Sequence, residues 1–170
     1  MVEIRPALWD DLSELRRIAI ETQLDTFGAA NTKENMDAFI RDQYSLVQFQ
    51  KEAAEPNSIC YMAWEGAEAA GFSRLRSTDE VEKLLGKNTL ELHRLYVTKS
   101  FQGKKVGAQL MQESIEYARK KGYDWLWLGV WEHNLKAQDF YRNWGFIRFS
   151  EHIFQMGEDA QTDWLLKLKL

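Results

Sequence analysis

"LHRLYVTKSFQGKKVGAQL", residues 92–110, is the stretch that decides the fold. Alternating apolar residues predict a long strand over Thr89–Val97, and apolar residues at helical spacing predict a helix over Val106–Lys121. A short glycine-containing turn joins the two. The first N–H groups of such a helix have no intrahelical partner, so the turn can hold an anionic ligand.

Three phosphate-binding patterns compete for this turn. A Walker A loop needs Gly-Lys followed by Ser or Thr, but Gly103-Lys104 is followed by Lys105. A dinucleotide fingerprint needs three glycines, and only Gly103 and Gly107 are present. The third pattern is a helix start that holds a pyrophosphate through backbone N–H groups, with the two lysines adding positive charge. The turn alone leaves open a plain helix start with exposed lysines.

Strands and helices are expected on both sides of this unit. The order predicts an α/β (α+β) fold with a mixed sheet and helices on both faces. The further elements are a strand at "VEIR", a helix capped by Asp10 or Asp11, helices beginning after Thr32 and Ser45, a hairpin of Ile59–Trp64 and Ala70–Leu75, a polar connection with a helical turn before Thr89, a buried strand at "DWLWLGV", a short helix from Asn134 to Gly145, and strands around Ile147–Met156 and Trp164–Leu170.

Composition bounds the class of protein. The chain of 170 residues is 45% hydrophobic and 28% charged, which predicts one globular domain over residues 1–170. Neither a secretory signal nor an apolar stretch of about 18 residues is present, so we expect a cytoplasmic protein away from membranes. Cys60 is the single cysteine, so the chain lacks a disulfide framework and a Cys/His metal cluster. It also lacks a basic patch interleaved with aromatics, so nucleic acid is not an expected partner.

Charge is unevenly distributed along the chain. Residues 1–90 hold sixteen acidic and ten basic side chains, whereas residues 91–170 hold ten and twelve. This asymmetry fits a protein that binds an anionic cofactor and a cationic partner. Unevenly charged solvated faces explain it equally well.

A second motif, "GVWEHNLKAQDFYRNWGF", follows downstream. It contains Asn-x-x-Ala, then Phe-Tyr, then Gly-Phe, while the turn contains Gln102 and Gly107 at the spacing Gln/Arg-x-x-Gly-x-Gly/Ala. Together the two motifs resemble the signatures of the GNAT superfamily of N-acetyltransferases over nearly the whole chain. Within the superfamily, "IETQLDTFGAANTKENMDAFI", "WLGVWEHN" and "HIFQMGEDAQTDW" resemble the bacterial PaiA-type spermidine/spermine N-acetyltransferases.

The resemblance implies the GNAT fold, with a mostly antiparallel central sheet, and acetyl-CoA as co-substrate without a metal. It implies that the backbone of Leu95, Tyr96 and Val97 pairs with the pantetheine arm. That pairing needs an open strand edge, which we expect where this strand splays from "DWLWLGV". The further cofactor-binding residues that it implies are Gln102, Gly103, Lys104, Lys105, Val106, Gly107, Ala108 and Asn134.

Two residues carry the implied chemistry. Tyr141 matches the general acid that protonates the leaving thiolate, and Glu91 aligns with the general base of some members. The alternatives are that Tyr141 only packs its helix and that Glu91 only pairs with a cation. His93, with a pKa expected near neutrality, is a second candidate base. Under strand alternation, Glu91, His93, Leu95 and Val97 are expected on one face.

The implied acceptor is a primary amine, in the form of a polyamine such as spermidine or spermine. Carboxylates in the PaiA-like stretches are candidates for attracting it: Asp25, Glu34, Glu158 and Asp159. Two alternatives stay open, namely acetylation of a protein N-terminus or lysine, and a catalytically weak acyl-CoA-binding sensor module. A homodimer is also left open.

Lys105 stands where the superfamily has its first glycine. A lysine with negative φ costs little and keeps its N–H available to a phosphate. We therefore expect negative φ at Lys105.

Overall fold

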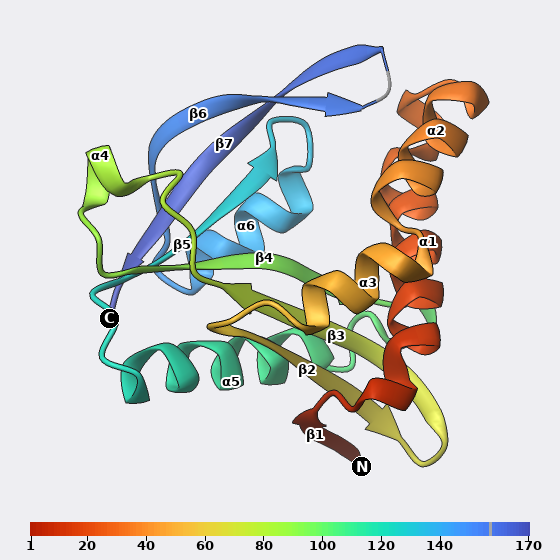
Figure 1. Ribbon diagram of the computed structural model, residues 1–170, viewed down its shortest axis with the longest axis horizontal. Coiled ribbons are helices and arrows are strands. Elements are labelled where there is room, and N and C mark those ends of the chain that lie inside the picture. Colours follow the sequence, from red (N-terminus) through yellow and green to blue (C-terminus); the bar gives the residue numbers. More distant parts are fainter. Residues whose placement is uncertain (157) are drawn as a thin grey trace.

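A mixed sheet forms the centre of the protein, whose computed structural model describes residues 1–156 and 158–170 (Figure 1). Among these residues, seven strands lie in the order β1-β2-β3-β4-β5-β7-β6. All neighbouring strands are antiparallel except β4 and β5. This confirms the predicted mixed, mostly antiparallel sheet. The strands are β1 (Val2–Pro6), β2 (Ser58–Glu65), β3 (Glu68–Arg76), β4 (Thr89–Val97), β5 (Trp125–Trp131), β6 (Ile147–Met156) and β7 (Asp159–Lys169).

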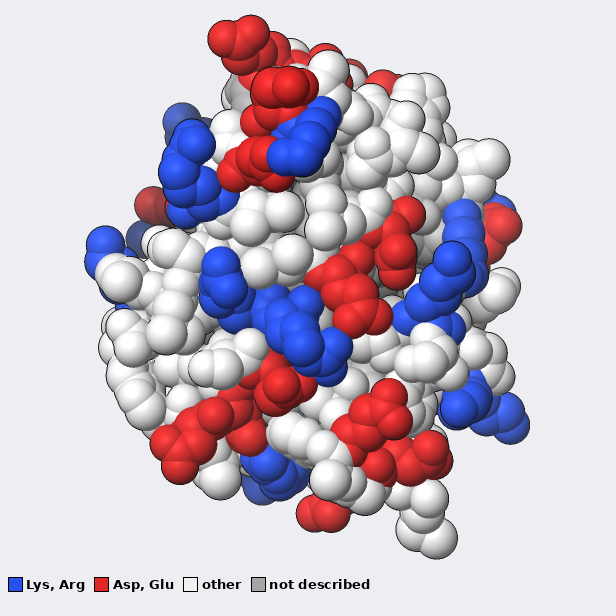
Figure 2. Space-filling model, turned by 90° about the vertical axis from the view of Figure 1, so that its right-hand side faces the viewer, with Lys and Arg blue, Asp and Glu red and all other residues white. Residues whose placement is uncertain are grey.

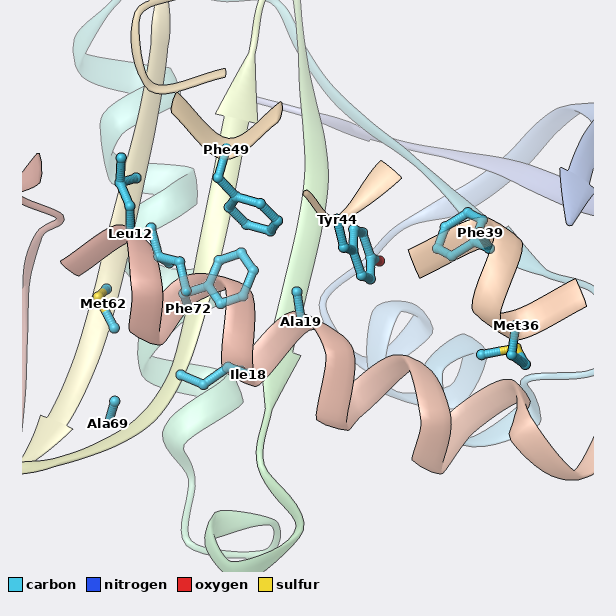
Figure 3. Packing of buried hydrophobic residues seen from close by; sticks show 11 residues of the cluster. Leu12, Ile18, Ala19, Met36, Phe39, Tyr44, Phe49, Met62, Ala69 and Phe72 are labelled. Carbon is cyan, nitrogen blue, oxygen red and sulfur yellow. The ribbon is translucent and has the colours of Figure 1, made fainter. Parts of the chain in front are cut away.

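Helices cover both faces of the sheet, as predicted. Ile18, Phe49 and Phe72 meet where α1 and α3 pack on β3 (Figure 3), and α2 extends this layer toward β6. On the opposite face, α5 and α6 pack on the leucines of β4 and β5. The helices are α1 (Leu12–Phe27), α2 (Lys33–Gln43), α3 (Leu46–Ala53), α4 (Glu82–Leu85), α5 (Val106–Lys120) and α6 (Leu135–Asn143). In the described part of the chain, no helix is long and apolar enough to cross a membrane.

Side-chain caps explain where most helices begin. The hydroxyls of Thr32 and Ser45 each accept a hydrogen bond from the N–H three residues on, at 3.2 Å, which confirms both predicted starts. Asp11 occupies the N-cap position of α1, as predicted, but its side chain does not cap the helix. The carboxylate of Asp11 instead accepts from the Arg5 guanidinium at 2.6 and 3.0 Å and from the Leu8 N–H at 2.7 Å. A 3-10 turn, Trp9–Asp11, therefore leads into α1.

β4 pairs with β5 over a short length only. The parallel register joins Thr89–Glu91 to Trp125–Trp127 and then stops. From Leu92 onward β4 is paired with β3 alone among the described strands. The strands splay as predicted, and one backbone edge of β4 is left open.

A bulge in β4 changes which side chains share a face. Arg74 pairs with Arg94 and Leu75 pairs with Leu92, so His93 is the extra residue. The alternation shifts by one position at the bulge. As a result, Leu95 packs on the α5 face, whereas Glu91 lies on the opposite one. The expectation that Glu91, His93, Leu95 and Val97 share one face is wrong.

The turn before α5 has left-handed backbone at two positions. Gly103 has φ of 80°, and Lys105 has φ of 65° and ψ of 10°. The expected negative φ at Lys105 is therefore wrong. The chain must pass from the 3-10 turn Lys99–Phe101 into α5 within four residues, Gln102 to Lys105, and this sharp turn uses the left-handed region twice. Lysine in that region costs about 1–2 kcal/mol relative to right-handed backbone.

We predict that Lys105→Gly raises the free energy of unfolding by about 0.5–1 kcal/mol, because relief of the strain exceeds the entropy lost on folding a glycine. Lys104→Gly is the matched control, since it removes the same charge at a residue without positive φ. This control should lower the free energy of unfolding by about 0.5–1 kcal/mol. Urea denaturation measures both changes, and shifts of the same sign would contradict the strain argument.

Candidate active site

A groove of about 670 Å³ follows the open edge of β4. The residues that line it come from α1, the end of β4, the turn, the first turn of α5, and α6; we call it the β4 groove. The predicted cofactor-binding residues that line it are Leu95, Val97, Gln102, Gly103, Lys105, Val106, Gly107, Ala108 and Asn134. Two predicted residues do not: Lys104 stacks its ammonium on the Phe101 ring at 4.6 Å, and Tyr96 faces the other side of the sheet.

The start of α5 offers free donors to the β4 groove. No side chain caps this end, and the first intrahelical bond that reaches back to Lys105 comes from the Gln109 N–H, at 3.1 Å. The N–H groups of Val106, Gly107 and Ala108 therefore have no intrahelical acceptor. Within the turn itself, the N–H groups of Gln102 and Lys104 donate to the carbonyls of Lys99 and Phe101, at 3.3 Å each, so the free donors come from the helix start. These donors, at the positive end of the helix dipole, fit a phosphate group.

Across the groove, α6 is tied to the turn. Lys136 donates to the Gln102 side-chain oxygen at 2.6 Å, and the Gln102 amide donates to the Val97 carbonyl at 3.3 Å. Asn134 caps α6 by accepting from the Ala137 N–H at 3.2 Å, as predicted. Its side-chain amide N–H groups remain for another partner.

A second cavity of about 290 Å³ lies deeper in the molecule and meets the β4 groove. We call it the inner cavity; its walls come from α1, α2, β4, β5, α6, β6 and β7, with Arg76 and Glu80 beside them. The two spaces share a few lining residues, which mark their junction. These are Thr22, Thr26, Leu95, Asn134, Ala137 and Tyr141.

Tyr141 is the one member of the junction that can donate a phenolic proton. Its ring packs between Phe140 and Phe146, with centroid distances of 5.4 and 5.8 Å. Within residues 1–156 and 158–170, its hydroxyl has no hydrogen-bond partner. Burial raises the pKa of Tyr141 above its ordinary value, so the phenol is protonated at neutral pH.

The two candidate bases differ in their electrostatics. Glu91 is buried and accepts from Arg76 Nε at 2.5 Å; burial raises the pKa of Glu91, and Arg76 opposes that rise. His93 Nδ1 lies 2.7 Å from a guanidinium nitrogen of Arg74. Burial and the nearby Arg94 hold the pKa of His93 well below its usual range. The expected near-neutral pKa of His93 is wrong, because the residue is buried and lies near three arginines.

Three residues of the inner cavity were missed by sequence reasoning. His152 Nδ1 lies 2.7 Å from Glu80 Oε1, and His152 Nε2 lies 3.8 Å from Asp163 Oδ2. Asp163 and Glu80 raise the pKa of His152 to about 9. The set comes from the β3–β4 connection, β6 and β7, and His152 and Asp163 are cross-strand partners. The strand register identifies this pair, but the last strand was expected around Trp164–Leu170, whereas β7 begins at Asp159, so Asp163 lay outside the predicted strand.

The four carboxylates predicted to attract a cation are scattered. Asp25 lines the β4 groove, whereas Glu34, Glu158 and Asp159 line neither space. Figure 2 shows acidic and basic side chains intermixed on the face that carries α1 and α2, without a continuous acidic field. Within the described ranges, no three His, Cys, Asp or Glu side chains are grouped to hold a metal ion.

Several N-acetyltransferases are similar to this protein over most of the chain. An N-acetyltransferase of uncharacterised role from Lactobacillus delbrueckii subsp. lactis is 42% identical over 94% of this chain and 92% of the relative. A spermidine N(1)-acetyltransferase of Thermoplasma acidophilum is 28% identical over 85% of this chain and 88% of the relative.

Solved structures agree on the fold. The PaiA N-acetyltransferase of T. acidophilum in complex with coenzyme A has a TM-score of 0.81 at 24% identity, with 100% of this chain and 99% of that chain covered. The ribosomal-protein-S18-alanine N-acetyltransferase of Escherichia coli has a TM-score of 0.73 at 18% identity, with 99% and 94% covered. One fold thus serves enzymes named for different acceptors.

A family model described as the acetyltransferase (GNAT) family matches residues 13–146. The matched residues include both of the sequence signatures and most of the residues that line the β4 groove and the inner cavity. The chain therefore belongs to the acetyltransferase (GNAT) family.

Proposed function

We propose that this protein transfers the acetyl group of acetyl-CoA to a primary amine of a polyamine such as spermidine or spermine. The observation that carries the proposal is the position of Tyr141, which lines both the β4 groove and the inner cavity. An acetyl donor bound in the β4 groove and an amine acceptor bound in the inner cavity would meet at this phenol. The relative named for spermidine N(1)-acetylation supports the choice of acceptor.

The β4 groove suits an extended donor with a pyrophosphate at one end. The open edge at Leu95–Val97 offers backbone groups to the amides of a pantetheine arm, in the manner of an added strand. The uncapped start of α5 offers N–H groups to the pyrophosphate. Coenzyme A carries both features, and its acetyl thioester supplies the activated acyl group.

The reaction is one direct attack. The amine nitrogen bonds to the thioester carbonyl carbon, and the electron pair of the broken C–S bond goes to sulfur. Tyr141 gives its phenolic proton to that sulfur, and Glu91 takes a proton from the amine directly or through a water. The raised pKa of Glu91 suits a base, because a more basic carboxylate accepts the proton more readily.

The function is tested by thiol release from acetyl-CoA with spermidine, spermine, simple monoamines, and peptides that present an N-terminus or a lysine. We expect the polyamines to have kcat/KM values at least about tenfold above the others, a modest specificity ratio of about 1.4 kcal/mol. Faster reaction with a peptide would favour a protein acceptor. Tight acetyl-CoA binding without thiol release above hydrolysis would favour an acyl-CoA-binding module.

We predict that Tyr141→Phe lowers kcat about 10²–10³-fold, because the thiolate then leaves without a proton, and that acetyl-CoA affinity changes little. The matched control is Tyr117→Phe on α5, which lines neither space and packs against Tyr61. Steady-state kinetics and calorimetric titration with acetyl-CoA measure the two effects. Unchanged turnover would remove Tyr141 from the role of general acid.

We predict that Glu91→Gln lowers kcat/KM about 10²–10³-fold. A carboxylate base works only when deprotonated, so wild-type activity should fall as the pH drops through a Glu91 pKa that lies above the ordinary carboxyl value. The variant should lose this acid limb, whereas His93→Gln should keep it. A pH–rate profile in which Glu91→Gln keeps the wild-type acid limb would exclude Glu91 as the base.

A further inference from the structure

The charged side chains of the inner cavity are not fully balanced. Arg76 is matched one to one by Glu91 at 2.5 Å. Arg94 belongs to a balanced set of two arginines and two glutamates, which is completed by Arg74, Glu52 and Glu55. What remains among the described lining residues is Glu80 and Asp163 with one histidine between them.

That remaining set carries one unmatched negative charge. With His152 protonated, one positive charge serves two carboxylates. The two contacts are also unequal, since Glu80 is at hydrogen-bond distance and Asp163, at 3.8 Å, is not. The Asp163 side chain is 17% exposed, so its carboxylate can still accept from a group inside the cavity.

Gly129 on β5 keeps this carboxylate accessible. A Cβ at residue 129 would lie 3.4 Å from Asp163 Oδ2 and 3.7 Å from His152 Nε2. Residue 129 shares a strand face with Trp127 and Trp131, so a larger side chain there would fill the space in front of the set. A glycine at this position leaves room for a ligand group to reach both Asp163 and His152.

We propose that Glu80, His152 and Asp163 form a subsite that binds a second ammonium group of the acceptor and so selects diamines and longer polyamines over monoamines. This inference rests on the proposed function. The reacting amine must be uncharged to attack, so it cannot neutralise the cavity. A second ammonium can, and its charge complements the single unmatched carboxylate.

The location of the subsite fits this role. Tyr141 and Asn134 belong to the junction with the β4 groove, whereas Glu80, His152 and Asp163 line only the inner cavity. An acceptor that reaches from the junction to the subsite therefore presents one amine to the thioester and another to the carboxylates. His152 holds Glu80 in place and leaves Asp163 as the main acceptor.

The test compares two acceptors of matched length, 1,5-diaminopentane and 1-aminohexane, in which a methyl group replaces the second ammonium. We expect wild-type kcat/KM to favour the diamine at least about tenfold, as expected when a site built for a charged partner meets an analogue that lacks it. Asp163→Asn and Glu80→Gln should each lower kcat/KM for the diamine about tenfold or more and leave the monoamine within about twofold. Gly129→Ala should reduce the preference without changing any charge.

Glu151→Gln is the matched control, because Glu151 is an exposed β6 carboxylate that pairs with Arg148 outside the inner cavity. It should keep the wild-type preference. Equal kcat/KM for both amines in the wild type, or an unchanged preference in Asp163→Asn, would overturn the subsite. If neither amine is acetylated, the proposed function fails, and calorimetric binding of the two amines to wild type and Asp163→Asn then decides the subsite separately.

Discussion

The limited pairing of β4 with β5 is the constraint on which the site depends. Three residues of each strand pair in parallel, and then the strands separate while β4 stays bonded to β3. The separation leaves one backbone edge of β4 without a strand partner at Leu95–Val97, where the Gln102 side-chain amide donates to the Val97 carbonyl at 3.3 Å. It also opens space that α6 fills in part, which brings Tyr141 to the junction between the β4 groove and the inner cavity. The β4 groove, the inner cavity and the position of Tyr141 therefore all depend on the separation of β4 from β5.

A buried ionic network holds the opposite face of β4 in place. Glu52 of α3 makes two hydrogen bonds to Arg94, at 2.5 and 3.0 Å, and the guanidinium stacks on Tyr44 and Phe49 at 5.1 Å each. Loss of Glu52 would leave the Arg94 guanidinium buried without its carboxylate, at a cost of about 3–5 kcal/mol, whereas loss of Arg94 would leave Glu52 with Arg74 at 3.6 Å. The bulge at His93 turns Arg94 toward α3 and leaves Leu95 on the groove side. The extra residue at the bulge therefore determines both that Arg94 binds α3 and that Leu95 lies on the groove side.

Local signals predicted much of this fold. Strand alternation placed β4 at its observed bounds, and capping residues placed the starts of α2, α3 and α6. The failures involve contacts and backbone angles that residue spacing does not reveal. The bulge leaves no mark on composition, the strain at Lys105 depends on how sharply the chain must turn, and Asp11 prefers a guanidinium from β1 to the helix end. The set of Glu80, His152 and Asp163 exists only once the strand register is known, because its members come from three separate segments.

The order of the strands in the sheet also affects how the protein folds during synthesis. β7, the last strand in chain order, lies between β5 and β6, so it must insert beside strands that are made before it. Every residue that lines the β4 groove precedes β6, whereas the wall of the inner cavity needs His152 and Asp163. A domain generally folds as one unit, so this sheet is completed only once β7 has been made. The last strand to be made, β7, therefore completes the sheet and joins the inner cavity to a groove whose residues have all been made before it.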